Sequence, residues 1–102
     1  METLIRIKQL VISGNTLFTR KARIEMDRDG ISEEDVREAI INAPSIAKTI
    51  RSKSKSAKEP EYLHVIPGLT YSGLYIYTKG KIKHYQGKDY LYVIISSKRY
   101  LG

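Results

Sequence analysis

The second half of the chain contains histidine, tyrosine and lysine, the side chains that can cleave RNA without a metal. Such cleavage needs a base for the 2′-hydroxyl proton, cations for the charge that develops at phosphorus, and an acid for the leaving 5′-oxygen. His64 lies between Leu63 and Val65, so strand alternation predicts that it faces away from the core. We therefore take His64 as the preferred general base or acid. For His64 and for His84, an ordinary surface role is the alternative.

A row of aromatic rings and cations follows from the alternation of residues 73–79. Leu74 and Ile76 are expected to face the core, which places three side chains on the other side of the strand: Tyr75, Tyr77 and Lys79. Antiparallel pairing with a later strand would bring Lys98 and Arg99 onto the same surface. Sheet packing is the alternative role for the tyrosines, because tyrosine favours strands.

The positive charge of the chain is concentrated in its second half. Residues 1–44 contain seven Lys and Arg against eight Asp and Glu, whereas residues 45–102 contain eleven against three. The tyrosines also lie in this half, from Tyr62 to Tyr100. Scattered lysines often form only a solvated surface, but cations interleaved with aromatic rings favour a polyanion with bases that can stack. RNA is the partner that the sequence predicts.

Several classes of chemistry are disfavoured by what the sequence lacks. The chain has no cysteine and two histidines, a poor set of ligands for zinc unless carboxylates contribute. It has no phosphate-binding loop, no dinucleotide motif and no nucleophile elbow. We expect no metal and no cofactor. No apolar run approaches the roughly 20 residues that span a bilayer, and residues 1–10 do not resemble a secretion signal. We therefore expect a cytoplasmic protein with no membrane partner.

The length of 102 residues predicts a single domain, 1–102. Apolar spacing predicts a helix over 4–12, a second helix that Thr19 caps and Gly30 ends, and a third that Ser32 caps and Pro44 ends. Beyond Pro44 the apolar period changes to two. The expected strands are 46–51, 62–66, 71–78, 82–85 and 90–96, with breaks at 67–68, 79–81 and 87–89. The prediction is an α+β fold in which N-terminal helices pack on one face of a C-terminal antiparallel sheet.

In the order of these elements the chain resembles the MqsR family of toxins from type II toxin–antitoxin systems, within the RelE-like superfamily. The resemblance covers most of the chain and rests on the order and spacing of several short segments together. These are Ile7 to Gly14, Thr19-Arg20-Lys21-Ala22, Asp29-Gly30-Ile31, Ile46-Ala47-Lys48, Gly73-Leu74-Tyr75 and Ile95-Ser96-Ser97-Lys98.

The resemblance implies a RelE/MqsR-like toxin domain, an mRNA interferase that cleaves mRNA without a metal and is silenced by a cognate antitoxin protein. The family's strand lysine falls on Lys48, its strand tyrosine on Tyr75 or Tyr77, and its terminal lysine on Lys98. The family's central glutamine has no clear counterpart, because the match there falls near Leu63 or His64. A histidine is chemically competent in that place. The catalytic set is then Lys48, His64, Tyr75 and Lys98.

The basic segment around residues 51–58 differs from the family, and we expect it to hold the phosphate backbone. The predicted substrate-binding residues are Arg51, Lys53, Lys55, Tyr77, Lys79 and Arg99. Dependence on the ribosome stays open. The main alternative is a non-catalytic RNA- or DNA-binding regulatory module that uses the same cationic sheet. A third interpretation is a protein-interaction domain that binds an acidic partner, which an acidic antitoxin would also satisfy.

Overall fold

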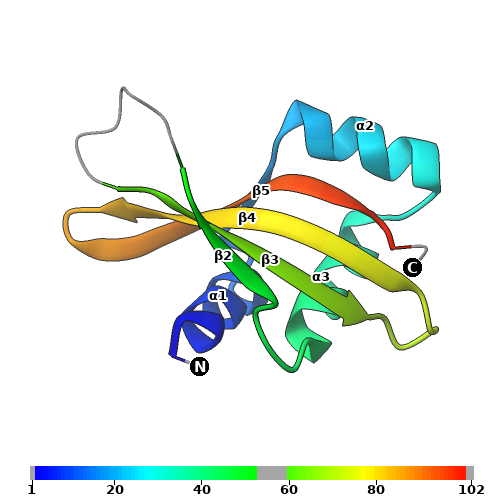
Figure 1. Ribbon diagram of the computed structural model, residues 1–102, viewed down its shortest axis with the longest axis horizontal. Helices are drawn as coiled ribbons and strands as arrows, with labels where there is room; N and C mark the ends of the chain where they lie inside the picture. The colour runs from blue at the N-terminus through cyan, green and yellow to red at the C-terminus, as the bar shows by residue number, and fades with distance from the viewer. Residues whose placement is uncertain (1, 53–59, 101–102) are drawn as a thin grey trace.

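The structure, a computed structural model, describes residues 2–52 and 60–100. Within them the chain forms three helices and a five-stranded mixed sheet, which confirms the α+β class (Figure 1). In chain order the elements are α1 (Glu2–Ile12), β1 (Thr16–Phe18), α2 (Arg20–Asp29), α3 (Glu33–Asn42), β2 (Lys48–Arg51), β3 (Tyr62–Leu69), β4 (Tyr75–Tyr85) and β5 (Lys88–Arg99). The predicted phosphate-binding residues Lys53 and Lys55 lie outside the described residues.

Helices α2 and α3 begin at the capping residues that the sequence indicates, whereas α1 begins at Glu2, two residues before the predicted start. The Thr19 side chain accepts a hydrogen bond from the Ala22 backbone N–H, and Gly30 ends α2 in the left-handed conformation with φ 69°. Ser32 and Asp35 form a capping box at the start of α3. These caps satisfy backbone groups that would otherwise lack partners at the helix ends.

The sheet has the strand order β1-β5-β4-β3-β2 and is not purely antiparallel. Strand β1 runs parallel to β5, with Leu17 opposite Val93. The prediction of an antiparallel sheet is therefore wrong at this edge. Three residues are too few to show a period of two, and β1 gains its backbone hydrogen bonds only from a strand some 75 residues later.

Strand β3 runs through the predicted break at 67–68 and pairs there with β4. Strand β4 is also one continuous strand, although the sequence predicts two with a turn at 79–81. Gly80 lies inside this strand because Tyr92 packs against it: a Cβ at position 80 would come 2.7 Å from the Tyr92 ring. The glycine therefore allows a close approach of a ring and does not form a turn. The turn between β4 and β5 instead uses Gln86 and Gly87, both with positive φ.

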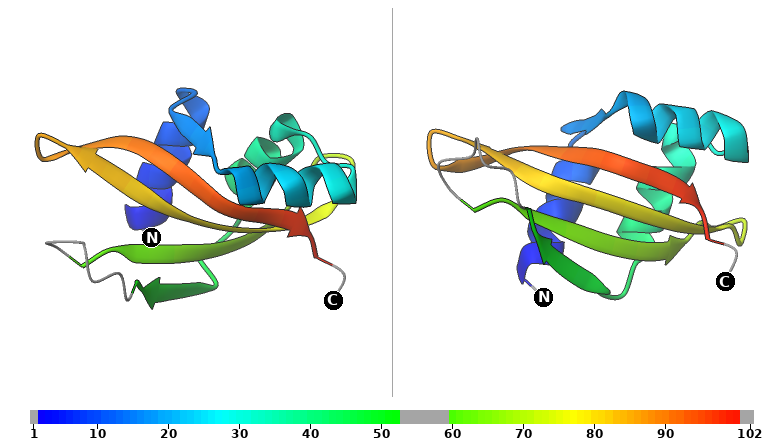
Figure 2. Two further views of the ribbon diagram at one scale, coloured as in Figure 1. Left: turned by 90° about the horizontal axis from the view of Figure 1, so that it is seen from above. Right: turned by 45° about the horizontal axis from the view of Figure 1, so that its top comes forward.

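Helices α1 and α3 cover one face of the sheet, whereas α2 lies along β5 (Figure 2). The apolar core lies between the helices and this face, and it includes Ile7, Ile40, Ile76 and Tyr92. The prediction of helices on one face is confirmed for α1 and α3. Helix α2 instead packs along the edge of β5, past the residues that pair with β1. There the Glu25 carboxylate accepts hydrogen bonds from Ser96 Oγ (2.8 Å) and from the Ser97 backbone N–H (3.1 Å).

The opposite face of the sheet is covered by no helix of the described residues (Figure 2). None of the three described helices is long and apolar enough to cross a membrane. The side chains on the uncovered face are therefore the ones that a large ligand could contact directly.

Candidate nucleic-acid interface

The uncovered face of the sheet gathers tyrosine and lysine side chains. Residues directly opposite one another in paired strands share a face, and the register sets Lys48 opposite Val65, Val65 opposite Lys79, and Tyr77 opposite Lys98. Alternation along β4 extends this set in both directions. We call this surface the lysine face and define it by Lys48, Tyr75, Tyr77, Lys79, Lys81, Lys83, Lys98 and Tyr100.

Two aromatic contacts arrange the end of the lysine face at which β4 begins and β5 ends. Lys98 Nζ lies 5.5 Å from the centre of the Tyr77 ring, within the range of a cation–π interaction. The rings of Tyr75 and Tyr100 meet edge to face with centroids 5.1 Å apart. Tyr75 is 41% exposed and Tyr100 44%. A cation and exposed ring surfaces are therefore available side by side for a phosphate and a base.

Four of the five lysines on the lysine face have no counter-ion among the described residues. Lys48, Lys79, Lys83 and Lys98 form no ion pair with any residue that the structure describes. Lys81 differs, because its Nζ lies 2.6 Å from Glu61 Oε2. Unpaired lysines on one face create a positive potential that attracts a polyanion. The predicted grouping of Tyr75, Tyr77, Lys79 and Lys98 is confirmed as a shared surface, with Lys48 added from β2.

The predicted orientation of His64 is wrong. His64 is only 8% exposed and lies on the helix-covered face of β3, the same face as Ile66. Its Nδ1 lies 3.2 Å from Thr49 Oγ1 of β2. Apolar residues line both sides of this strand, so alternation alone could not show which side carries the core. Burial, and then the charge of Arg6, lower the pKa of His64 below its usual value.

Two predicted binding arginines also lie away from the lysine face. Arg99 is opposite Ile76 in the register and therefore points to the other side of the sheet, where its backbone N–H donates to Asp29. Arg51 is opposite Tyr62 and shares a face with Thr49 and not with Lys48. Neighbouring residues of a strand point to opposite faces, so Lys98 and Arg99 could not both face one ligand on the same side of the sheet.

Sequence reasoning missed Lys81, Lys83 and Tyr100 as members of the lysine face. The signal for both lysines was present, because the alternation that starts at Tyr75 continues unbroken past Gly80. The predicted turn at 79–81 ended this alternation before Lys81 and Lys83, so neither lysine was assigned to the face. Tyr100 could be placed only through its contact with the Tyr75 ring.

Within residues 2–52 and 60–100, no group of three or more His, Asp or Glu side chains is arranged to hold a metal ion. No family model, curated protein or solved structure matches the chain.

Proposed function

We propose that this protein is a metal-independent endoribonuclease that binds single-stranded RNA on the lysine face. The observation that carries the proposal is the contact between Lys98 Nζ and the Tyr77 ring, on a face where Lys48 and Lys79 have no counter-ion among the described residues. A cation beside a phenol, with further cations across the strands, supplies charge for a phosphate and a group that can exchange a proton.

The chemistry assigns separate tasks to the two residue types. The ammonium groups of Lys48, Lys79 and Lys98 stabilise the negative charge that grows on the phosphate oxygens during attack by the 2′-hydroxyl. The phenol groups of Tyr75 and Tyr77 serve proton transfer and base stacking. His64 does not contact RNA bound on this face, because its side chain lies on the opposite side of the sheet.

We extend the proposal to the toxin class that the sequence resembles. Support comes from the order of a helix, a short strand and two helices before four consecutive antiparallel strands, and from the presence of Lys48, Tyr77 and Lys98 on one face. On this proposal the protein is a RelE/MqsR-like mRNA interferase that acts in the cytoplasm, with the ribosome as a possible further partner, and a cognate antitoxin covers the lysine face. An antitoxin with an acidic segment would complement the unpaired lysines.

The decisive experiment incubates the purified chain with a long single-stranded RNA in EDTA and maps the product ends. Expected products carry 5′-hydroxyl and 2′,3′-cyclic phosphate ends, as attack by the 2′-hydroxyl requires. Lys98→Ala and Tyr77→Phe should lose cleavage while they still fold. Lys21→Ala is the matched control, since it removes an exposed cation from α2 outside the lysine face.

Intact RNA in this assay, and again after translating ribosomes are added, would contradict the ribonuclease proposal. Cleavage that appears only with ribosomes would assign the enzyme a ribosome-dependent mode. Equal cleavage by Lys98→Ala and Lys21→Ala would show that the active site lies elsewhere on the molecule.

A second candidate function is a binding module that holds RNA on the lysine face without cleaving it. One observation favours it: the residues that define the lysine face are all lysines or tyrosines, so the face itself contains neither a histidine nor a carboxylate that could act as general base. RNA binding that weakens steeply with salt, without any product, would support this function.

A further inference from the structure

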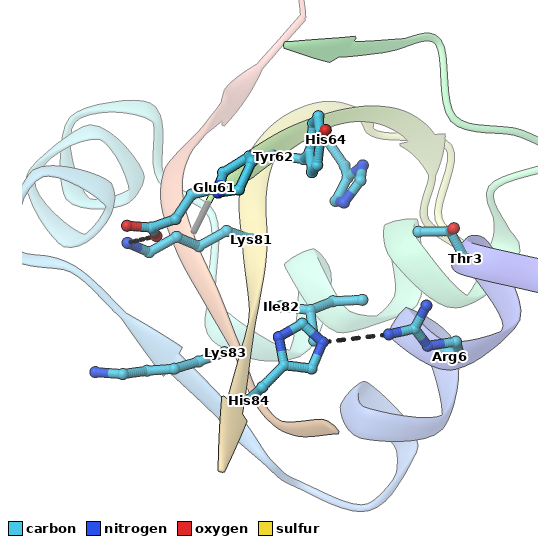
Figure 3. A pocket seen from close by; sticks show the side chains of 10 residues that line it. Thr3, Arg6, Glu61, Tyr62, His64, Lys81, Ile82, Lys83 and His84 are labelled. Carbon is cyan, nitrogen blue, oxygen red and sulfur yellow. Dashed lines mark hydrogen bonds and ion pairs between the residues drawn. The ribbon is translucent and has the colours of Figure 1, made fainter. Parts of the chain in front are cut away.

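A cavity of about 500 Å³ opens on the helix-covered side of the sheet, between α1 and strands β3 and β4 (Figure 3). Both histidines of the chain line it, together with Arg6 from α1. His64 comes from β3 and His84 from β4, so residues distant in the sequence meet here. Lys81 and Lys83 border the cavity, but their ammonium groups lie on the other side of β4 (Figure 3).

Asp89 of β5 holds Arg6 and His84 in place. The Arg6 guanidinium donates from Nε and from Nη2 to the two Asp89 carboxylate oxygens, each at 2.7 Å. His84 Nε2 lies 3.2 Å from Asp89 Oδ1 and 3.3 Å from Arg6 Nη2. Bidentate contact with a carboxylate fixes the plane of a guanidinium. Arg6 is therefore preorganised, and its position does not depend on a ligand.

Hydrogen-bonding groups at the cavity remain without partners. Arg6 Nη1 has no hydrogen-bond partner among the described residues, because the Asp89 carboxylate occupies only Nε and Nη2. His64 uses Nδ1 in its contact with Thr49, and its Nε2 has no partner within the described part of the chain. His64 Nε2 is not among the fully buried unpartnered atoms of the described residues, so this nitrogen is open to the cavity and accessible to a ligand.

We propose that this cavity binds a phosphate group, with Arg6 Nη1 donating to it from α1 and His64 Nε2 contacting it from β3. His84, held by Asp89, adds positive charge at the cavity when it is protonated. The proposal concerns a site on the opposite side of the sheet from the lysine face. It holds whether or not the lysine face cleaves RNA.

The donors at the cavity fit a phosphate better than a cation or an apolar molecule. A guanidinium has only donors, and a protonated imidazole donates from both nitrogens. Phosphate oxygens accept several such bonds at once, and arginine is the side chain that most often recognises them. A metal ion is disfavoured because Arg6 places a fixed positive charge at the site and no described cluster of ligands surrounds it.

Protonation of His64 and phosphate binding should favour each other. The charged groups around the cavity come from every adjacent element: Glu2 and Arg6 of α1, Arg51 of β2, Glu61 beside β3, His84 of β4 and Asp89 of β5. Glu61 is paired with Lys81, and Asp89 with Arg6. Burial, and then the positive charge of Arg6, lower the pKa of His64, and a bound anion would offset the charge of Arg6.

The test measures the titration of both histidines in the wild-type chain by NMR, with and without inorganic phosphate at constant ionic strength. If phosphate prefers protonated His64 by ten-fold, saturation raises the pKa of His64 by about one unit. The variant His84→Gln assigns the remaining histidine signal to His64. Unchanged titration of both histidines at high phosphate concentration, compared with chloride, would overturn the proposal.

A variant series tests the same site through affinity. His64→Gln should weaken phosphate binding about five-fold, the factor that corresponds to the loss of one hydrogen bond. Lys21→Ala removes a cation on α2 and should leave phosphate affinity unchanged. Equal affinities for the wild type and His64→Gln would overturn the proposal, and the wild-type titration decides it if that variant does not fold.

The source of the phosphate is resolved by two short RNAs of the same sequence, one with a 5′-phosphate and one with a 5′-hydroxyl. A shift of the His64 signal by the phosphorylated RNA alone, at a lower concentration than inorganic phosphate requires, identifies an RNA terminus as the ligand. A response to inorganic phosphate alone identifies the free anion. Absence of a response to every one of these probes contradicts the proposal.

Discussion

Lys98 holds its ammonium group 5.5 Å from the centre of the Tyr77 ring, because the β4–β5 register sets these two residues directly opposite each other. A tight turn at Gln86 and Gly87 joins the strands, and two register shifts, at Lys83/His84 and Lys79/Gly80, then bring Tyr77 opposite Lys98. A one-residue slip of the register would move Lys98 to the core side of the sheet. The contact therefore depends on the same register that buries Ile76.

Lys98→Ala should lower kcat/KM for RNA cleavage by about 100-fold, the usual cost of losing one group that stabilises developing negative charge. Lys98→Arg should retain much of the binding, because the charge remains. The measurement is single-turnover cleavage at several salt concentrations, in which Lys98→Ala should also reduce the salt slope of binding by about one. Identical kinetics for Lys98→Ala and Lys21→Ala would refute the assignment.

Gly68→Ala should destabilise the fold by at least about 2 kcal/mol. A Cβ at this position would lie 1.9 Å from the backbone oxygen of Ala39, so α3 must move away from β3. Gly14→Ala is the comparison, since the space there is open and only the positive φ of 77° is strained, at a cost of about 1 kcal/mol. Urea unfolding measures the free energy of unfolding of both variants against the wild type. Equal losses would contradict the close approach of helix and sheet.

Glu25→Ala should lower the free energy of unfolding by about 2 kcal/mol, because it leaves a buried hydroxyl and a buried backbone N–H without an acceptor. Glu25→Gln keeps one acceptor oxygen and should cost less. Asp27→Ala changes an exposed carboxylate on the same helix and serves as the control. Thermal unfolding of the three variants tests whether the loss of stability is largest for Glu25→Ala, smaller for Glu25→Gln and smallest for Asp27→Ala. A stable Glu25→Ala protein would mean that α2 does not need this carboxylate to dock on β5.

The stability of the chain should fall as the pH falls below 6.5, in part through His64. Burial and Arg6 lower the pKa of His64 from its ordinary value of 6.5, so the unfolded chain binds more protons between 6.5 and the folded pKa. The free energy of unfolding therefore decreases as the pH falls through this window and levels off, for this group, below the folded pKa. Urea unfolding of wild type and His64→Gln at pH 8 and pH 5 measures the difference. A variant with the same pH dependence as the wild type would exclude this contribution.

The helices and much of the lysine face follow from local sequence. Thr19, Gly30 and Ser32 determine helix ends because their side chains or backbone freedom act within one turn. Alternation determined that Tyr75, Tyr77 and Lys79 share a side of β4, because the period of a strand is a local property of the backbone. Residue type and order were sufficient to predict these helix ends and the shared side of β4.

Tertiary structure alone decided which face His64 occupies and which groups meet it. Leu63, Val65 and Ile66 make both sides of β3 apolar, so only the docking of α1 and α3 shows which side is covered. Arg6 and Asp89 are 83 residues apart and form the ion pair beside His84 only when α1 packs against the sheet. The parallel pairing of β1 with β5 is equally non-local. Such contacts depend on the packing of whole elements, which no local pattern of residue types records.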